Sequence, residues 1–165
     1  MIENRRTVGI VVGLAITLAG LVAMARGTAT AGAVEQSTAA QAGSKGHGKM
    51  VFVLTTGLED LQSVNMAIRH SAMALKSGYL DDSVLLVYGR GVQAFSKEIT
   101  AKPPQTSVFI QQAKQAGVRI LVCGEAIRRF NIPKEKLEPG VDAVVPNSIV
   151  TLAELVSKGY QIIKY

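Results

Sequence analysis

Cys123 is the residue of this sequence most suited to take part in a reaction, and it is the only cysteine among 165 residues. It lies in the stretch RILVCGEAIRRF, where an apolar run ends and a helix-like segment begins. Backbone N–H groups at a helix start favour a thiolate mildly, while Glu125 in the same turn opposes it and Arg128 and Arg129 follow one turn later. Two interpretations are open: a mildly activated thiol, or a buried cysteine that packs as a small hydrophobe.

Other chemistries find little support in the sequence. A cysteine–histidine hydrolase needs a base close to the thiol, but His47 lies between glycines and His70 falls in mid-helix on the face opposite the predicted core. One cysteine and two distant histidines lack metal-ligand spacing, so we expect no metal site. Gly89-Arg90-Gly91 lacks the third glycine of a dinucleotide fingerprint, and no phosphate-loop motif occurs, so we expect no cofactor.

Residues 1–33 have the pattern of a bacterial export signal. Arg5 and Arg6 precede an uncharged apolar stretch over residues 8–25, and Ala-x-Ala endings follow. The apolar stretch is close to the lower limit of ~17 residues for a membrane span, so both a cleaved signal peptide and a retained N-terminal anchor are open. In either case the remainder is expected to cross the membrane. We therefore predict a periplasmic protein whose only membrane contact is this N-terminal segment.

The remainder of the chain is predicted to be a linker followed by one folded domain. Residues 34–48 contain no large apolar side chain after Val34, so they cannot bury enough surface to offset the entropy of ordering, and we expect a disordered linker. Residues 49–165 are long enough for a sizeable core. The basic residues are scattered and tryptophan is absent, which argues against a nucleic-acid partner despite the net charge of +6.

The order of apolar segments predicts an α/β domain. Five short apolar runs are typical of buried strands: 49–57, 83–91, 118–124, 141–146 and 160–165. Helical patterns lie between them, over 61–75, 92–95, 107–116, 125–130 and 148–158. Strands that are apolar on both sides and alternate with helices indicate a parallel sheet covered on both faces. We predict a three-layer α/β/α fold with about five parallel strands.

Such a sheet binds ligands beyond the carboxyl ends of its strands. The strand-end segments are Thr55-Thr56-Gly57, Tyr88-Gly89-Arg90-Gly91, Cys123-Gly124 and Pro146-Asn147-Ser148, and we expect them to meet at one rim. Cys123 is the candidate catalytic residue, and Gly124, Gly89, Arg90 and Gly91 are candidates for binding the substrate. Glycine lets the backbone approach a ligand closely, although ordinary turns also use it, and Arg90 suits either an anion or solvent.

From about Met50 to Tyr165 the sequence resembles the DsrE/DsrF-like sulfur-relay family. The resemblance lies in the order of four segments: VFVLTTGLED, VLLVYGRGVQAF, AKQAGVRILVCGEAIRRFNI and VVPNSIVTLAELVSKGYQIIKY. It implies a five-stranded parallel sheet and assembly into homo-oligomers such as trimers or hexamers. It also implies a persulfide on Cys123, with sulfur passing from rhodanese-like donor proteins to small sulfur-carrier acceptor proteins.

Two features depart from the family pattern. Gly124-Glu125-Ala126 follows the cysteine where many relatives have a polar Asn-Thr-type stretch, and the leader predicts export, whereas relatives of known role are mostly cytoplasmic. The leading hypothesis is a sulfur carrier or sulfurtransferase that accepts and passes on sulfane sulfur at Cys123 outside the cytoplasm. The alternatives are a non-catalytic oligomeric binding or scaffold domain in which Cys123 is structural, and a small-molecule sensor that uses Arg90.

Overall fold

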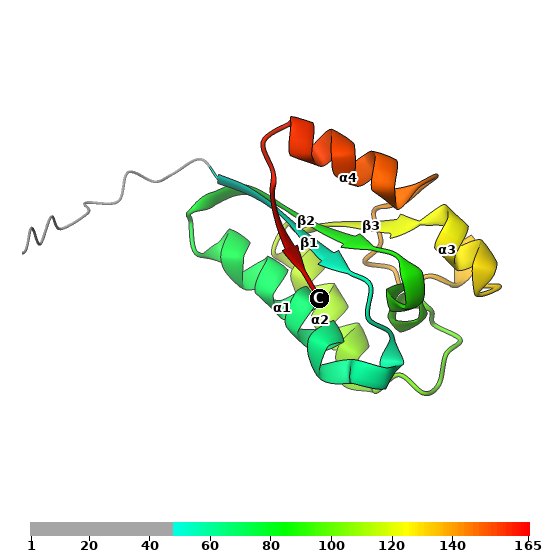
Figure 1. Ribbon diagram of the computed structural model, residues 1–165. Helices are drawn as coiled ribbons and strands as arrows, with labels where there is room; N and C mark the ends of the chain where they lie inside the picture. Colours follow the sequence, from blue (N-terminus) through cyan, green and yellow to red (C-terminus); the bar gives the residue numbers. More distant parts are fainter. Residues whose placement is uncertain (1–47) are drawn as a thin grey trace, which may run out of the picture. The chain divides into compact units, whose positions relative to one another are not determined.

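The structure, a computed structural model, describes residues 48–165 (Figure 1). The strands are β1 (Gly48–Leu54), β2 (Leu80–Val87), β3 (Arg119–Cys123), β4 (Ala143–Val145) and β5 (Gln161–Lys164). The α-helices are α1 (Leu61–Lys76), α2 (Pro104–Gln115), α3 (Gly124–Arg129) and α4 (Ser148–Ser157). Short 3₁₀ segments are η1 (Leu58–Asp60), η2 (Gly89–Phe95) and η3 (Lys134–Lys136). The expected export signal and residues 34–47 of the expected linker lie outside the described residues, and Gly48, its last residue, already belongs to β1.

The five strands form one parallel sheet in the order β4-β3-β2-β1-β5, which confirms the predicted fold class. From β1 to β4 each strand is added to the same side of the one before, and β5 then returns to the opposite edge beside β1. Right-handed crossovers place helices on one face when the chain advances and on the other when it returns. Accordingly α1 and α2 cover one face and α4 the other (Figure 1). Within residues 48–165, no helix combines the length and the apolar character that a membrane span requires.

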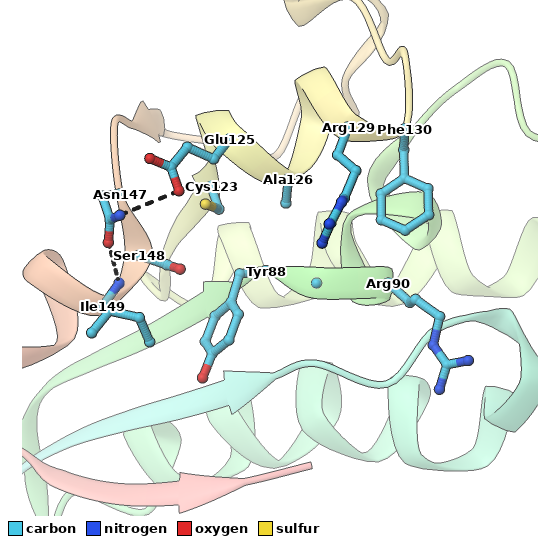
Figure 2. Close-up of a pocket in the computed structure, with 11 residues that line it drawn as sticks. Tyr88, Arg90, Cys123, Glu125, Ala126, Arg129, Phe130, Asn147, Ser148 and Ile149 are labelled. Carbon is cyan, nitrogen blue, oxygen red and sulfur yellow. Dashed lines mark hydrogen bonds between the residues drawn. The ribbon is translucent and has the colours of Figure 1, made fainter.

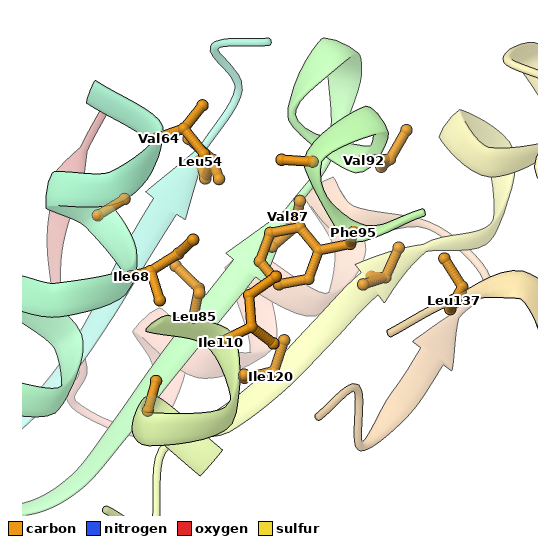
Figure 3. Packing of buried hydrophobic residues seen from close by; sticks show 14 of the residues in the cluster. Leu54, Val64, Ile68, Leu85, Val87, Val92, Phe95, Ile110, Ile120 and Leu137 are labelled. Carbon is orange, nitrogen blue, oxygen red and sulfur yellow. The ribbon is translucent and has the colours of Figure 1, made fainter. Parts of the chain in front are cut away.

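Alternation along the strands divides the core between the two faces. In β1, Phe52 packs on the side of α1 and α2, whereas Val51 and Val53 pack on the side of α4. The larger cluster is shown in Figure 3 and includes Leu54, Val64, Ile68, Leu85, Val87, Val92, Phe95, Ile110, Ile120 and Leu137. The smaller cluster consists of Val51, Val53, Val84, Leu86, Leu155 and Tyr160. The α4 face is therefore closed mainly by one helix.

Several predicted elements differ from the structure in their bounds; residues 88–91, expected in the second strand, lie beyond β2, and Gly89 begins η2. The helix expected from residue 107 begins at Pro104, because proline at the first helical position has no N–H to leave unpaired and its φ already suits a helix. The sheet is covered on both faces, as predicted, but all residues of its edge strand β5 are exposed. As the edge strand beyond β1, β5 is covered only in part by its neighbours.

A buried ion pair fixes the loop between η2 and α2. Lys102 contacts the carboxylate of Glu138, and its Nζ also donates a hydrogen bond to the carbonyl oxygen of Ser96 at 2.9 Å. The hydroxyl of Ser107 donates to Glu138 at 2.8 Å. The two charged side chains are only 6% and 7% exposed, so removal of either partner would leave the other charge buried without compensation.

We therefore expect Lys102→Met to lower the free energy of unfolding by about 3–5 kcal/mol. The measurement is chemical denaturation followed by circular dichroism. Lys136→Met is the matched control, because its ion pair with Glu98 is exposed and should contribute little. Addition of Glu138→Leu to Lys102→Met should restore much of the lost stability. Equal losses in Lys102→Met and the control would contradict this account.

Candidate functional site

A cavity of about 550 Å³ opens at the carboxyl edge of the sheet (Figure 2). Its lining residues are Tyr88, Gly89, Arg90, Cys123, Glu125, Ala126, Arg129, Phe130, Asn147, Ser148 and Ile149. The structure thus brings together three of the four predicted strand-end segments, those that follow β2, β3 and β4. After β3 the chain packs α3 against the larger core cluster, and after β4 it crosses to α4 on the other face. Crevices where neighbouring strands send their connections to opposite faces are the usual ligand sites of open α/β sheets.

Cys123 is the last residue of β3, and its side chain lies at the base of this cavity with only 4% of the residue exposed. The first turns of two helices surround its sulfur. Backbone N–H groups of Glu125 and Ala126 in α3, and the backbone N–H and hydroxyl of Ser148 in α4, are the donors that lower the pKa of its thiol. A thiolate at this position is therefore solvated by protein donors rather than by bulk water.

Asn147 explains why the first turn of α4 is available to Cys123. As the N-cap, its Oδ1 accepts hydrogen bonds from the backbone N–H groups of Ile149 at 2.9 Å and Val150 at 3.2 Å. This cap does not use the preceding N–H, that of Ser148. Asn147 Nδ2 also donates to Glu125 Oε2 at 3.2 Å, so one side chain connects the starts of α3 and α4 (Figure 2). The hydrogen bond from Asn147 also holds the carboxylate of Glu125, which lies two residues after Cys123.

Burial of the sulfur raises the pKa of the Cys123 thiol, but the hydrogen bonds from Ser148 and from the two helix starts lower it by more. The net pKa lies below the ordinary cysteine value, so this thiol ionises more readily than that of an ordinary cysteine. The position of Cys123 before a helix predicts the contribution of α3. The sequence does not identify Ser148 as a donor, because that contact depends on how the β4–α4 connection packs against β3.

The three glycines predicted to bind substrate have different positions. Gly89 lines the cavity with a φ of +58°, a left-handed conformation that glycine adopts without strain. Gly91 is buried, and a Cβ there would lie 2.8 Å from the carbonyl oxygen of Leu54. A Cβ on Gly124 would lie 3.2 Å from the carbonyl oxygen of Val145. Neither Gly91 nor Gly124 lines the cavity, so their absent side chains serve close packing, and Gly124 brings the turn after β3 against β4.

The two arginines of the cavity point in different directions. Arg90, the predicted anion-binding residue, forms an ion pair with Glu59 at 2.9 Å, and its guanidinium points away from Cys123 (Figure 2). Arg129 extends into the cavity beside Phe130, and its side chain has no ion pair or hydrogen bond within residues 48–165. The cation available inside the cavity is therefore Arg129, which sequence analysis considered only as a neighbour of Glu125.

His70 does not take part in this site. Its Nδ1 lies 2.7 Å from the hydroxyl of Tyr165, and neither residue lines the cavity. Across residues 48–165, no group of three or more histidine, cysteine, aspartate or glutamate side chains is placed to hold a metal ion. Chemistry in the described part of the site is thus centred on the thiol and on the hydrogen-bond donors around it.

Comparison with known proteins places this site in a family. The model of the DsrE/DsrF-like family matches residues 48–165, which is most of the chain and includes the whole cavity. The chain belongs to this family. DsrE/DsrF-like proteins are associated with sulfur relay in general, a process in which they work with partner proteins. Among curated proteins, none matches the sequence.

Solved structures share the fold of this DsrE/DsrF-like protein. MTH1491 of Methanobacterium thermoautotrophicum, a protein of unknown function, is 16% identical with a TM-score of 0.56, and the match covers 72% of this chain and 99% of that one. The YchN protein of E. coli gives the same identity, TM-score and coverage. BT1422 of Bacteroides thetaiotaomicron is 17% identical with a TM-score of 0.54, covering 71% of this chain and 95% of its own. These likenesses show the common α/β architecture.

The contribution of Ser148 to the thiolate can be measured by the pH dependence of Cys123 alkylation. Ser148→Ala removes a hydrogen bond that stabilises the thiolate, so the midpoint of the alkylation profile should move to higher pH and alkylation at neutral pH should slow. Iodoacetamide labelling followed by mass spectrometry gives the profile.

Ser157→Ala is the matched control, because Ser157 lies at the other end of α4 and its hydroxyl bonds to the carbonyl oxygen of Glu154. Its profile should coincide with that of the wild type. The denatured chain should have a midpoint above that of the folded wild type. A Ser148→Ala profile that matches the wild type would show that this hydroxyl does not stabilise the thiolate.

Proposed function

We propose that this protein carries sulfane sulfur as a persulfide on Cys123 and passes it to an acceptor thiol. The observation that supports this proposal is the set of hydrogen-bond donors that converges on the sulfur from two helix starts and favours its anionic form. A packing cysteine has no need of such donors, whereas a nucleophilic sulfur does. The cavity above Cys123 supplies the space that a donor molecule requires.

The chemistry is thiol–disulfide exchange applied to a persulfide. The Cys123 thiolate attacks the outer sulfur of a donor R–S–SH, the donor S–S bond breaks, and R–S⁻ leaves with the bonding electron pair. Cys123 then carries –S–SH. In the second step an acceptor thiolate attacks that outer sulfur and the Cys123 thiolate leaves. A depressed pKa favours the second step, because a more acidic thiol is a better leaving group. Neither step needs an oxidant or a general base.

The alternative function is a binding or scaffold domain in which Cys123 is structural. The small exposed fraction of Cys123 favours this alternative. The two functions differ in a measurable property. A structural cysteine would react slowly in the native protein and would carry no sulfur cargo, while a carrier cysteine would accept a single additional sulfur atom.

We expect the wild type to gain the mass of one sulfur atom after incubation with a persulfide donor and removal of excess reagent. Intact-protein mass spectrometry detects the change, and cyanolysis that releases thiocyanate confirms sulfane sulfur. Cys123→Ser should gain nothing. Absence of added sulfur on wild type whose Cys123 is readily alkylated would rule out the carrier function. Slow alkylation together with no added sulfur would support the scaffold alternative.

The place of action is a second part of the proposal. From the sequence of residues 1–33 we infer that the protein is periplasmic. After export it is either released by cleavage of this segment or held at the membrane by it. Exported proteins usually pair their cysteines in disulfides, and a lone cysteine cannot do so within one chain. Transfer of sulfur through a persulfide would explain why an exported protein has an unpaired cysteine. The partners of the protein are then the sulfur donors and acceptors.

Self-assembly is the third part of the proposal, and exposed apolar side chains support it. Eight large hydrophobic residues of the described chain are exposed, and five of them lie on α4 and β5: Ile149, Val150, Val156, Ile162 and Ile163. Ile162 pairs with Val51 in the sheet register, so its side chain lies on the same face as α4. The outer edge of β5 also has no neighbouring strand in the described sheet. We infer that a second copy packs against the α4–β5 surface.

Light scattering after size-exclusion chromatography should therefore give a multiple of the monomer mass. The double variant Val150→Asp/Val156→Asp should shift the mass toward the monomer, because it places charge in the inferred interface. Val108→Asp is the matched control on α2, where Val108 is 45% exposed outside this surface. A monomeric wild type, or equal effects of the two variants, would contradict assembly through α4 and β5.

A further inference from the structure

The position of Cys123 restricts what can reach it. The residue is 4% exposed and lies inside a cavity of about 550 Å³, a volume typical of small-molecule sites. A donor protein with a flat surface would cover the mouth of this cavity, and the persulfide on that surface would not reach the thiol of Cys123. A slender molecule can enter and place its outer sulfur against Cys123. The geometry therefore favours a small sulfur donor.

The charges in the cavity restrict the donor further. Arg90 is paired with Glu59, and Glu125 is held by Asn147 at the side of the site. Of the two arginines that line the cavity, Arg129 is the one whose side chain has no ion pair or hydrogen bond among residues 48–165, and it extends into the cavity. A guanidinium binds a carboxylate through two parallel hydrogen bonds, which gives direction as well as energy.

The walls of the cavity between these polar groups are largely apolar. Tyr88, Phe130 and Ile149 line it together with Ala126 (Figure 2). A ligand that matches this lining has a short apolar stem, an anionic end for Arg129 and a sulfur at the other end for Cys123.

We propose that the sulfur donor is a low-molecular-weight alkyl persulfide that bears a carboxylate, and that Arg129 binds this carboxylate. This inference rests on the proposed function. The bound donor ⁻OOC–R–S–SH is attacked at its outer sulfur by the Cys123 thiolate, its S–S bond breaks, and the product ⁻OOC–R–S⁻ leaves with the electron pair. Cys123 retains the transferred sulfur as –S–SH. Arg129 is a binding residue that recognises the donor and does not contact the reacting sulfurs.

The test compares two donors of similar size, the persulfides of 3-mercaptopropionate and 2-mercaptoethanol, which differ in the carboxylate. The rate constant for persulfidation of Cys123 is measured by quenched mass spectrometry on the folded protein. Each value is divided by that of the urea-unfolded chain, which removes the intrinsic difference between the donors. The variants are Arg129→Gln and Arg128→Gln, since Arg128 is the adjacent arginine and does not line this cavity.

The folded wild type should prefer the carboxylate donor by about tenfold, which corresponds to about 1.4 kcal/mol of binding. Arg129→Gln should lose this preference, because its rate falls more with the carboxylate donor than with the neutral one. Arg128→Gln should keep the wild-type preference. A wild type without preference, an equal loss for both donors in Arg129→Gln, or the same loss in Arg128→Gln would overturn the inference.

The test also separates this inference from the proposed function. If the wild type accepts sulfur from a persulfidated rhodanese-type protein but from neither small donor, the small-donor inference is wrong and the carrier function stands. If Cys123 accepts sulfur from no donor while it remains open to alkylation, both are wrong.

Discussion

The candidate site depends on the contact between the start of α4 and a sulfur atom at the end of β3. That contact exists because the chain changes direction after β4. The first four strands advance across the sheet, and the return to β5 carries α4 to the opposite face. The connection after β4 therefore begins beside the turn after β3, and the hydroxyl and N–H of Ser148 reach Cys123. Without the reversal, Cys123 would have only the donors of its own short helix.

Several features of the packing keep these two turns together. The missing side chain of Gly124 allows the turn after β3 to lie against Val145, and Asn147 both caps α4 and bonds to Glu125. The buried pair of Lys102 and Glu138 fixes the loop that follows η2. The rigid surroundings let hydrogen bonds offset the burial of the sulfur.

Much of this arrangement follows from the sequence. Apolar runs and helical spacing predict the order of strands and helices, and the parallel sheet then predicts that Cys123 and Asn147 approach the same edge. The sequence does not specify which face each helix covers, so the donor role of Ser148 was missed. It also does not separate Arg90 from Arg129, because the direction of Arg90 depends on its ion pair with Glu59, a contact set by how the turns after β1 and β2 pack. The start of α2 at Pro104 was missed because proline both breaks helices and begins them. The exposure of β5 was missed because its position at the sheet edge is a property of topology.

Since the chain has a single cysteine, one spectrum can follow the whole cycle. With ¹³C in the cysteine side chain, the Cβ resonance of Cys123 reports its ionisation during a pH titration, and then its change on addition of a persulfide donor and of an acceptor thiol. We predict a midpoint below that of the unfolded chain, a new resonance for the persulfide, and return of the original resonance when the acceptor is added. A midpoint at or above that of the unfolded chain, with no new resonance on addition of donor, would contradict the account.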